Sequence, residues 1–144
     1  DQGWYTTPYG MTFYFPDTKV QKSGYITNTT NIYNYPVQGF ATGEIIPIAL
    51  IYFWHKTRNL ALHIFSTVHD SIVSKVHKDA VKGVMEIAKE CLTTDVYRFL
   101  DVVYNYKFVV PLGLGVKAGD CWGDEKAVEY KWDVWPDGHD VERT

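Results

Sequence analysis

The segment LALHIFSTVHDSIVSKV, residues 60–76, decides which fold we expect for this chain. Two runs of branched and aliphatic residues flank a polar centre that consists of His69, Asp70 and Ser71. Branched side chains favour the pleated surface of a sheet, and a polar break between two such runs is typical of a hairpin. We therefore expect two antiparallel strands that meet at this polar turn.

An amphipathic helix is expected directly after the hairpin. Apolar residues at helical spacing fall on one of its faces: Ala80, Val81, Val84, Met85, Ala88, Cys91 and Leu92. The opposite face carries Lys82, Glu86 and Lys89. Because a helix of this kind buries its apolar face, we expect it to pack on the strands.

On the N-terminal side, the sequence predicts a second hairpin followed by a loop. Residues 4–15 are dense in Tyr, Thr and Phe, and the turn-forming Pro8-Tyr9-Gly10 divides them into two short strands. Residues 17–28 are mostly polar and predict a connection without regular structure.

A long helix is expected after this loop. Residues 29–31 offer three capable N-caps, and apolar residues then recur near helical spacing, so we expect the helix to end near His55. Pro36 lies early enough for the first turns to accommodate it. Pro47 lies within the pattern and is expected to kink or split the helix.

The C-terminal side is less informative. Residues 102–110 alternate loosely and predict a strand, whereas Gly113, Gly115 and Gly119 predict loops. Beyond Gly123 the sequence is charged and aromatic and gives no assignment. Together these elements predict an α+β fold, in which a long helix and a second amphipathic helix pack on short antiparallel strands.

Composition narrows the class of protein. With 46% hydrophobic and 22% charged residues over 144 positions, the chain has the balance of one globular domain rather than of a disordered segment. The formal net charge of -3 argues mildly against a general phosphate-binding surface. Charged residues interrupt the longest apolar region and no signal peptide is evident, so we expect a cytoplasmic protein without a membrane partner.

The cysteines do not form a metal-binding pattern. Cys91 and Cys121 lack C-x-x-C spacing and a second pair. We expect both to be reduced thiols, and we expect no zinc or haem site.

His69-Asp70 is the chemically most suggestive pair, with His63 and His77 nearby. Taken alone, the pair is consistent with a simple turn in which the Asp70 side chain bonds the backbone. The pair also resembles the metal-binding dipeptide of HD-type phosphohydrolases. Those enzymes carry it on helices, whereas the surrounding pattern here is that of strands.

Four sequence blocks, in this order, resemble the C-terminal third of family A DNA polymerases, the group of bacterial DNA polymerase I and phage replicases. GWYTTPYG (residues 3–10), followed by Phe15-Pro16, is similar to the family's G-Y-V-x-T-x-x-G-R hairpin. NYPVQGFA (residues 34–41), which runs into Glu44-Ile45-Ile46, is similar to its N-x-P-x-Q-G-x-x-A-D-I-I helix start.

The other two blocks lie in the second half of the chain. VHDSIV (residues 68–73) with VHKDAV (residues 76–81) resembles the family's V-H-D-E hairpin, motif C, and the helix after it. Gly113-Leu114-Gly115 through Trp122 resembles its closing G-x-G-x-x-W element. The resemblance implies that residues 1–123 are a C-terminal palm segment and leaves residues 124–144 as a tail of unassigned role.

The resemblance implies template-directed DNA synthesis, in which a primer 3′-hydroxyl attacks the α-phosphate of a deoxynucleoside triphosphate with the help of two Mg²⁺ ions. Asp70 is then the catalytic aspartate of motif C and a magnesium ligand, because Mg²⁺ prefers oxygen ligands. His69 is implied to position the primer end. Asn34 and Gln38 are implied to contact the minor groove of the primer–template duplex.

Departures from the family pattern qualify these roles. Ser71 stands where the family usually has Glu, and Thr30 and Met11 stand where it usually has Arg. The family's motif A strand, with the second metal-binding aspartate, and its fingers helix belong upstream of these residues. We therefore expect the chain to be inactive alone and to need the upstream polymerase segment, in the same or a separate chain. The alternative is a palm remnant that binds DNA or another polymerase segment without turnover.

Overall fold

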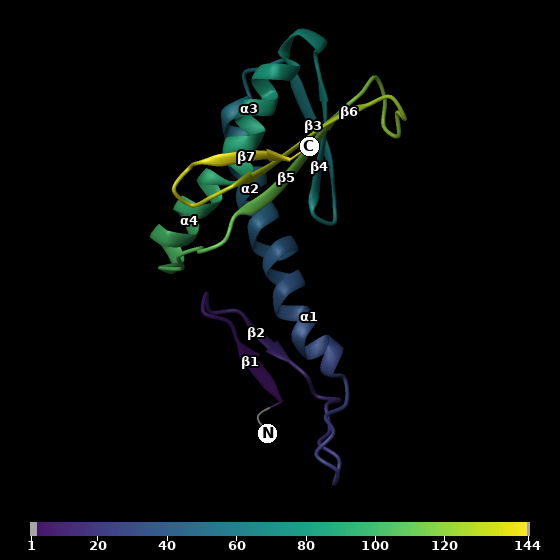
Figure 1. Ribbon diagram of the computed structural model, residues 1–144, viewed down its shortest axis with the longest axis vertical. Helices are drawn as coiled ribbons and strands as arrows, with labels where there is room; N and C mark the ends of the chain where they lie inside the picture. Colours follow the sequence, from purple (N-terminus) through teal and green to yellow (C-terminus); the bar gives the residue numbers. More distant parts are fainter. Residues whose placement is uncertain (1–2, 144) are drawn as a thin grey trace.

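The hairpin predicted around His69 is confirmed by the computed structural model, which describes residues 3–143 (Figure 1). Strands β3 (Leu62–Val68) and β4 (Ser71–Val76) pair antiparallel and leave a two-residue connection at His69 and Asp70. The register shifts between Ile64 and Ser66, where an irregularity of the bulge type increases the local twist.

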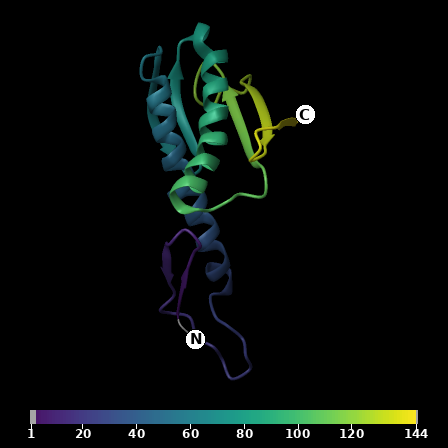
Figure 2. The same ribbon diagram turned by 90° about the vertical axis from the view of Figure 1, so that its left-hand side faces the viewer.

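The amphipathic helix is also confirmed, as α3 (Val81–Leu92), which follows a short 3-10 turn at Lys78–Ala80. Its apolar face packs against two different parts of the structure. Val84 and Cys91 pack with the β3–β4 hairpin and with Phe53, whereas Met85 and Leu92 pack against a second sheet. Figure 2 shows α3 between the hairpin and that second sheet. The position of α3 therefore sets the spacing between the two sheets.

The long helix is present in three parts: α1 (Thr29–Phe40), a π-helical turn (Ala41–Ile45) and α2 (Ile46–Thr57). Pro47 has no N–H group and its ring crowds the preceding turn, so regular α-helical bonding fails there. The backbone N–H of Ile46 instead reaches back five residues to the Ala41 carbonyl. Pro47 thus interrupts the α-helical bonding pattern, while the helical path continues.

The predicted N-caps are not used. Asn28 is the N-cap residue, in a left-handed conformation and without a side-chain cap bond, while Thr29 donates its hydroxyl to the Ile26 carbonyl. Alongside α1, strands β1 (Trp4–Thr6) and β2 (Thr12–Tyr14) form the predicted N-terminal hairpin.

That hairpin packs on one side of α1. The Tyr9 hydroxyl donates to the Pro36 carbonyl at 3.4 Å, and the Tyr9 ring lies 4.7 Å from the ring of Phe40. Gly39 permits the close approach, because a Cβ at that position would lie 2.6 Å from Cζ of Phe13. The hairpin therefore covers the side of α1 that carries Pro36 and Gly39.

The prediction of a strand at residues 102–110 is wrong. Residues 102–104 are instead the end of helix α4 (Thr94–Tyr104), which is capped by Asn105 in a left-handed conformation, and residues 105–110 form neither a helix nor a strand. Val96 and Leu100, four residues apart, are fully buried against α2, whereas Val102 and Val103 are exposed. The β-branched residues suggested a strand, but the buried face of α4 decides its conformation.

The prediction of loops at Gly113, Gly115 and Gly119 is wrong for the first two. Strand β5 (Leu112–Ala118) pairs with β6 (Val128–Val134), and β6 pairs with β7 (Asp140–Arg143). The two glycines face outward and alternate with Leu114, which is buried. A side chain on Gly113 would collide with the Arg143 guanidinium of the same sheet. The residues beyond Gly123, which the sequence left unassigned, thus complete an antiparallel sheet.

Helix α2 is the element around which the core forms. Ile48 and Ala49 pack with α4, and Phe53 packs with α3. By length and composition alone, the helical stretch Thr29–Thr57 would suffice to cross a membrane. The absence of a membrane partner stays a prediction.

Candidate functional site

The His69–Asp70 connection is a tight and strained turn. His69 has a φ of 54°, a conformation that a residue with a Cβ adopts at a cost of about 1 kcal/mol or more. Positive φ in a two-residue connection matches the twist of the flanking strands. The Ser71 hydroxyl donates to the Val68 carbonyl at 2.8 Å and closes the turn. Ser71, which stands where the family usually has Glu, therefore stabilises the turn that holds Asp70.

Asp70 is available to a ligand. Its side chain and that of His69 are exposed, and within residues 3–143 Asp70 makes no ion pair and accepts no hydrogen bond from a side chain. A carboxylate at a strand turn without an internal cation has both oxygens free for a metal ion or a donor group.

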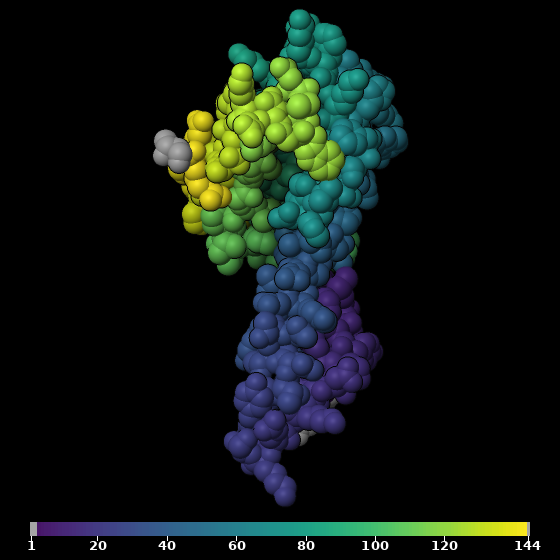
Figure 3. All heavy atoms as spheres, turned by 90° about the vertical axis from the view of Figure 1, so that its right-hand side faces the viewer, coloured from purple at the N-terminus to yellow at the C-terminus, as the bar shows by residue number. Residues whose placement is uncertain are grey.

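A groove with a volume of about 620 Å³ begins at Asp70. It is lined by consecutive residues of the hairpin, Asp70–Ser74, and by consecutive residues of the second sheet, Leu112–Gly119. Apolar residues of α3, among them Met85 and Ala88, also line it. Figure 3 shows this hollow between the teal hairpin and the yellow-green strands. Asp70 and β5 therefore line the same groove, although the sequence analysis predicted loops at the glycines of β5.

Asn34 and Gln38 occupy one exposed side of α1. They are four residues apart and therefore neighbours on the helix surface. Pro36, two residues from each, lies on the opposite side, where the N-terminal hairpin covers the helix. Neither residue lines the groove, but Ala41 and Ile45 of the next turn do. In Figure 1 the turn of the β3–β4 hairpin points toward the end of the molecule that holds α1.

Metal-binding capacity in the described residues is limited. Within residues 3–143 no group of three or more His, Cys, Asp and Glu side chains could hold a metal ion together. Asp70 fits Mg²⁺ by the chemistry of its oxygens, but one carboxylate is too few for two ions. His63 and His77 lie on or beside strands and not on helices, so the HD-type arrangement is not reproduced.

Another carboxylate, Asp95, is the opposite of Asp70 in its surroundings. It is 1% exposed, and Nζ of Lys56 lies 2.7 Å from its Oδ2 and 2.9 Å from Oε1 of Glu90. Burial acts to lower the pKa of Lys56, but the hydrogen bonds to Asp95 and Glu90 outweigh it and raise the pKa overall. No local sequence pattern could indicate the pair of Lys56 and Asp95, because the two residues are 39 positions apart in the chain.

The fold and the hairpin define a partial, palm-like α+β segment. A family model for DNA polymerase family A matches residues 1–124, which is most of the chain. The chain therefore belongs to DNA polymerase family A, a lineage of nucleotidyltransferases that act on DNA with nucleotide substrates and generally use divalent metals. No curated protein and no solved structure compared with the chain gave a match.

Proposed function

We propose that this chain supplies the motif C side of a DNA polymerase active site, where a primer 3′-hydroxyl is joined to an incoming deoxynucleotide. The observation that carries the proposal is the His69–Asp70 turn. It offers an exposed carboxylate, which has no ion pair within residues 3–143, on a strained connection between two paired strands. Strain of this kind persists where the surrounding structure fixes it, and it concentrates at functional sites.

Asp70 is the residue that would hold Mg²⁺ in this segment. Two such ions, when bound, activate the attacking hydroxyl and neutralise charge on the transferring phosphate. The contribution of Asp70 is a fixed negative charge at the mouth of the groove. His69, next to it in the turn, would donate a hydrogen bond to the primer end and hold it near that charge.

Asn34 and Gln38 would contact the minor groove of the primer–template duplex. Both side chains carry hydrogen-bond donors, and the minor groove presents acceptors at every base pair. Their exposure on the uncovered side of α1 supports this role. Contacts of this kind detect correct base pairing without distinguishing the base sequence, and a replicating enzyme requires this property.

The segment needs a second carboxylate and cations for the triphosphate, which the proposal assigns to the upstream part of the polymerase. Those residues would belong to the same polypeptide or to a separate one, in the cytoplasm of a bacterium or of a phage-infected cell. The second candidate function is a palm remnant that binds DNA or polymerase without turnover. The replacement of the usual Glu by Ser71, which leaves a single carboxylate in the turn, favours that alternative.

Primer extension separates the two functions. The 144-residue chain and the upstream polymerase segment would be purified separately and mixed with a primer–template, deoxynucleoside triphosphates and Mg²⁺. The proposal predicts extension by the mixture and none by either part. Binding of DNA by the mixture without extension would favour the remnant. Synthesis by the 144-residue chain alone would show that the second metal ligand lies within it.

A further inference from the structure

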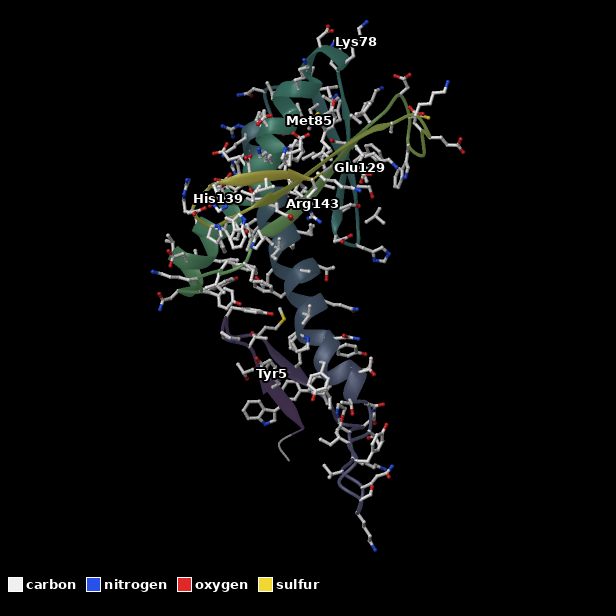
Figure 4. All side chains as sticks on the ribbon, in the orientation of Figure 1. Tyr5, Lys78, Met85, Glu129, His139 and Arg143 are labelled. Atoms are coloured by element: carbon white, nitrogen blue, oxygen red, sulfur yellow. The ribbon has the colours of Figure 1, made fainter. Side chains whose placement is uncertain are left out.

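Residues 3–40 form an arm that projects from the body of the molecule, residues 46–143. The arm consists of α1, the β1–β2 hairpin and the loop between them. Figure 3 shows it as a separate lobe, and Figure 4 shows Tyr5 on the arm and Lys78 at the far end of the body. The chain passes from arm to body once, through the π-helical turn Ala41–Ile45. The direction of the arm therefore depends on this turn and on the side chains around it.

Several causes of helix bending meet at this turn. The N–H of Ile46 bonds five residues back, to Ala41, and Pro47 has no N–H group to donate. The hydroxyl of Thr42 donates to the Gln38 carbonyl at 2.7 Å, a side-chain bond of a kind that often bends helices. The backbone bonds of the helix constrain its direction least at this point, so contacts with the body are needed to fix it.

One side-chain hydrogen bond joins the turn to the body. The hydroxyl of Tyr104, the last residue of α4, donates to Oε2 of Glu44 at 3.0 Å. This bond raises the pKa of Tyr104, so the hydroxyl keeps its proton at neutral and mildly alkaline pH. Within the described part of the chain, no other side-chain hydrogen bond and no salt bridge joins residues 3–45 to residues 46–143.

The other contacts across the turn are between aromatic rings. The Phe40 ring lies 5.7 Å from the rings of Tyr106 and Phe108. The Tyr9 ring lies 6.3 Å from the rings of Tyr104 and Tyr106. Aromatic pairs at such distances are stable in both offset-stacked and edge-on arrangements. These rings therefore hold the arm against the body without fixing its angle, and the directional contact is the Tyr104–Glu44 bond.

A small rotation at the turn would displace the proposed DNA contacts by a large amount. Asn34 lies ten residues before Glu44, which corresponds to about 15 Å along an α-helix. A rotation of about 10° at the turn would move Asn34 by about 3 Å. Hydrogen bonds tolerate a variation of only a few tenths of an ångström about their usual length, so such a rotation would break them.

We propose that the Tyr104–Glu44 hydrogen bond fixes the direction of α1 relative to the β3–β4 hairpin. Tyr104 and Glu44 are then positioning residues, which keep Asn34 and Gln38 in line with a duplex whose primer end lies at Asp70. The role toward the duplex rests on the proposed function, whereas the control of the arm by this bond does not.

The distance between two spin labels tests the control of the arm without DNA. Asn31→Cys in α1 and Lys82→Cys in α3 introduce labelling sites at exposed positions, and Cys121→Ser removes the exposed native thiol, while Cys91 is buried. Tyr104→Phe then removes the hydroxyl and keeps the ring in its aromatic contacts. We expect a narrow distance distribution with Tyr104 and a distribution about 3 Å wider with Tyr104→Phe, as a rotation of about 10° implies.

Tyr106→Phe is the matched control, because the Tyr106 hydroxyl makes no hydrogen bond within residues 3–143. It should leave the distribution narrow. Glu44→Gln keeps an oxygen that accepts from Tyr104 and should also leave it narrow, whereas Glu44→Ala should widen it. Circular dichroism would verify that each variant is folded. A narrow distribution with Tyr104→Phe, or equal widening with Tyr106→Phe, would overturn the proposal.

Primer extension by the assembled polymerase tests the role toward the duplex. Tyr104→Phe should lower the extension rate by up to about tenfold, the value of one lost hydrogen bond to DNA. In a chain that already carries Asn34→Ala and Gln38→Ala, it should have less than about a twofold further effect, because it acts through those residues. A full further loss would overturn the positioning role. A widened distribution with an unchanged extension rate would reject the duplex contacts of α1 and leave the control of the arm established.

Discussion

Asp70 and Asp95 are chemically identical side chains with opposite surroundings. Asp70 is exposed in a strained turn and has no cation beside it within residues 3–143, whereas Asp95 is buried and is held by Lys56. The ammonium group of Lys56 compensates the negative charge of Asp95 within the protein. The carboxylate of Asp70 is available to a ligand from outside this segment. The same substitution at the two positions should therefore have different effects on activity and on stability.

The largest effect is expected for Asp70→Asn, measured as primer extension by the assembled polymerase. The amide keeps the size of the side chain but loses the charge that binds metal, so the rate should fall at least about a thousandfold. The free energy of unfolding should change by less than about 0.5 kcal/mol, because the residue is exposed and unpaired. The matched control is the exposed Asp101→Asn, which should alter neither quantity.

Asp95→Asn should reverse this pattern. It leaves Lys56 with Glu90 as its remaining close partner, and the free energy of unfolding should fall by roughly 2–4 kcal/mol. Urea denaturation followed by circular dichroism measures the loss. A change below about 0.5 kcal/mol would show that the buried pair does not stabilise the fold, and the contrast with Asp70 would then disappear.

Asn34→Ala and Gln38→Ala are each expected to lower the extension rate about tenfold, the value of one lost hydrogen bond to DNA. The free energy of unfolding should stay nearly constant, since both residues are exposed. Asn59→Ala, at an exposed position after α2, is the control. If Asn34→Ala and Asn59→Ala extend primers at the same rate, the assignment of α1 to the duplex is wrong.

The smallest effect concerns the two thiols, which repeat the contrast between buried and exposed groups. Burial raises the pKa of Cys91 from 9.0 to about 12. The stability that its neutral form contributes is fully present below pH 9.0 and is lost as pH rises through about 12. At mildly alkaline pH, iodoacetamide should therefore modify Cys121 alone in the folded chain. Mass spectrometry that finds Cys91 equally modified would contradict its burial.

Local patterns predicted the elements that build the site. Alternating β-branched runs identified β3 and β4, and apolar residues at helical spacing identified α3, because one face of each is buried in the core. Inference from local residue types was wrong for two later elements, α4 and β5. Val102 and Val103 suggested a strand but lie on the exposed side of α4, and the glycines of β5 suggested a loop but accommodate a neighbouring side chain.

Other features arise only from tertiary packing. The Lys56–Asp95 pair and the groove between β4 and β5 join residues that are distant in the chain, so no local pattern could indicate them. The positions of Asp70, His69, Asn34 and Gln38 came from the family resemblance. Their exposure is an observation of the structure, while their roles in catalysis and DNA binding stay predictions.

The most direct test of the account is a change of metal preference at position 70. In Asp70→Cys, a thiolate replaces the carboxylate, and thiolates bind softer divalent ions in preference to Mg²⁺. The assembled Asp70→Cys enzyme should be nearly inactive in primer extension with Mg²⁺ and should extend primers at least about tenfold faster with Co²⁺. Asp70→Asn should not recover with either ion. Extension by Asp70→Cys or Asp70→Asn at the unmodified rate with Mg²⁺ would contradict the claim that Asp70 holds the catalytic metal.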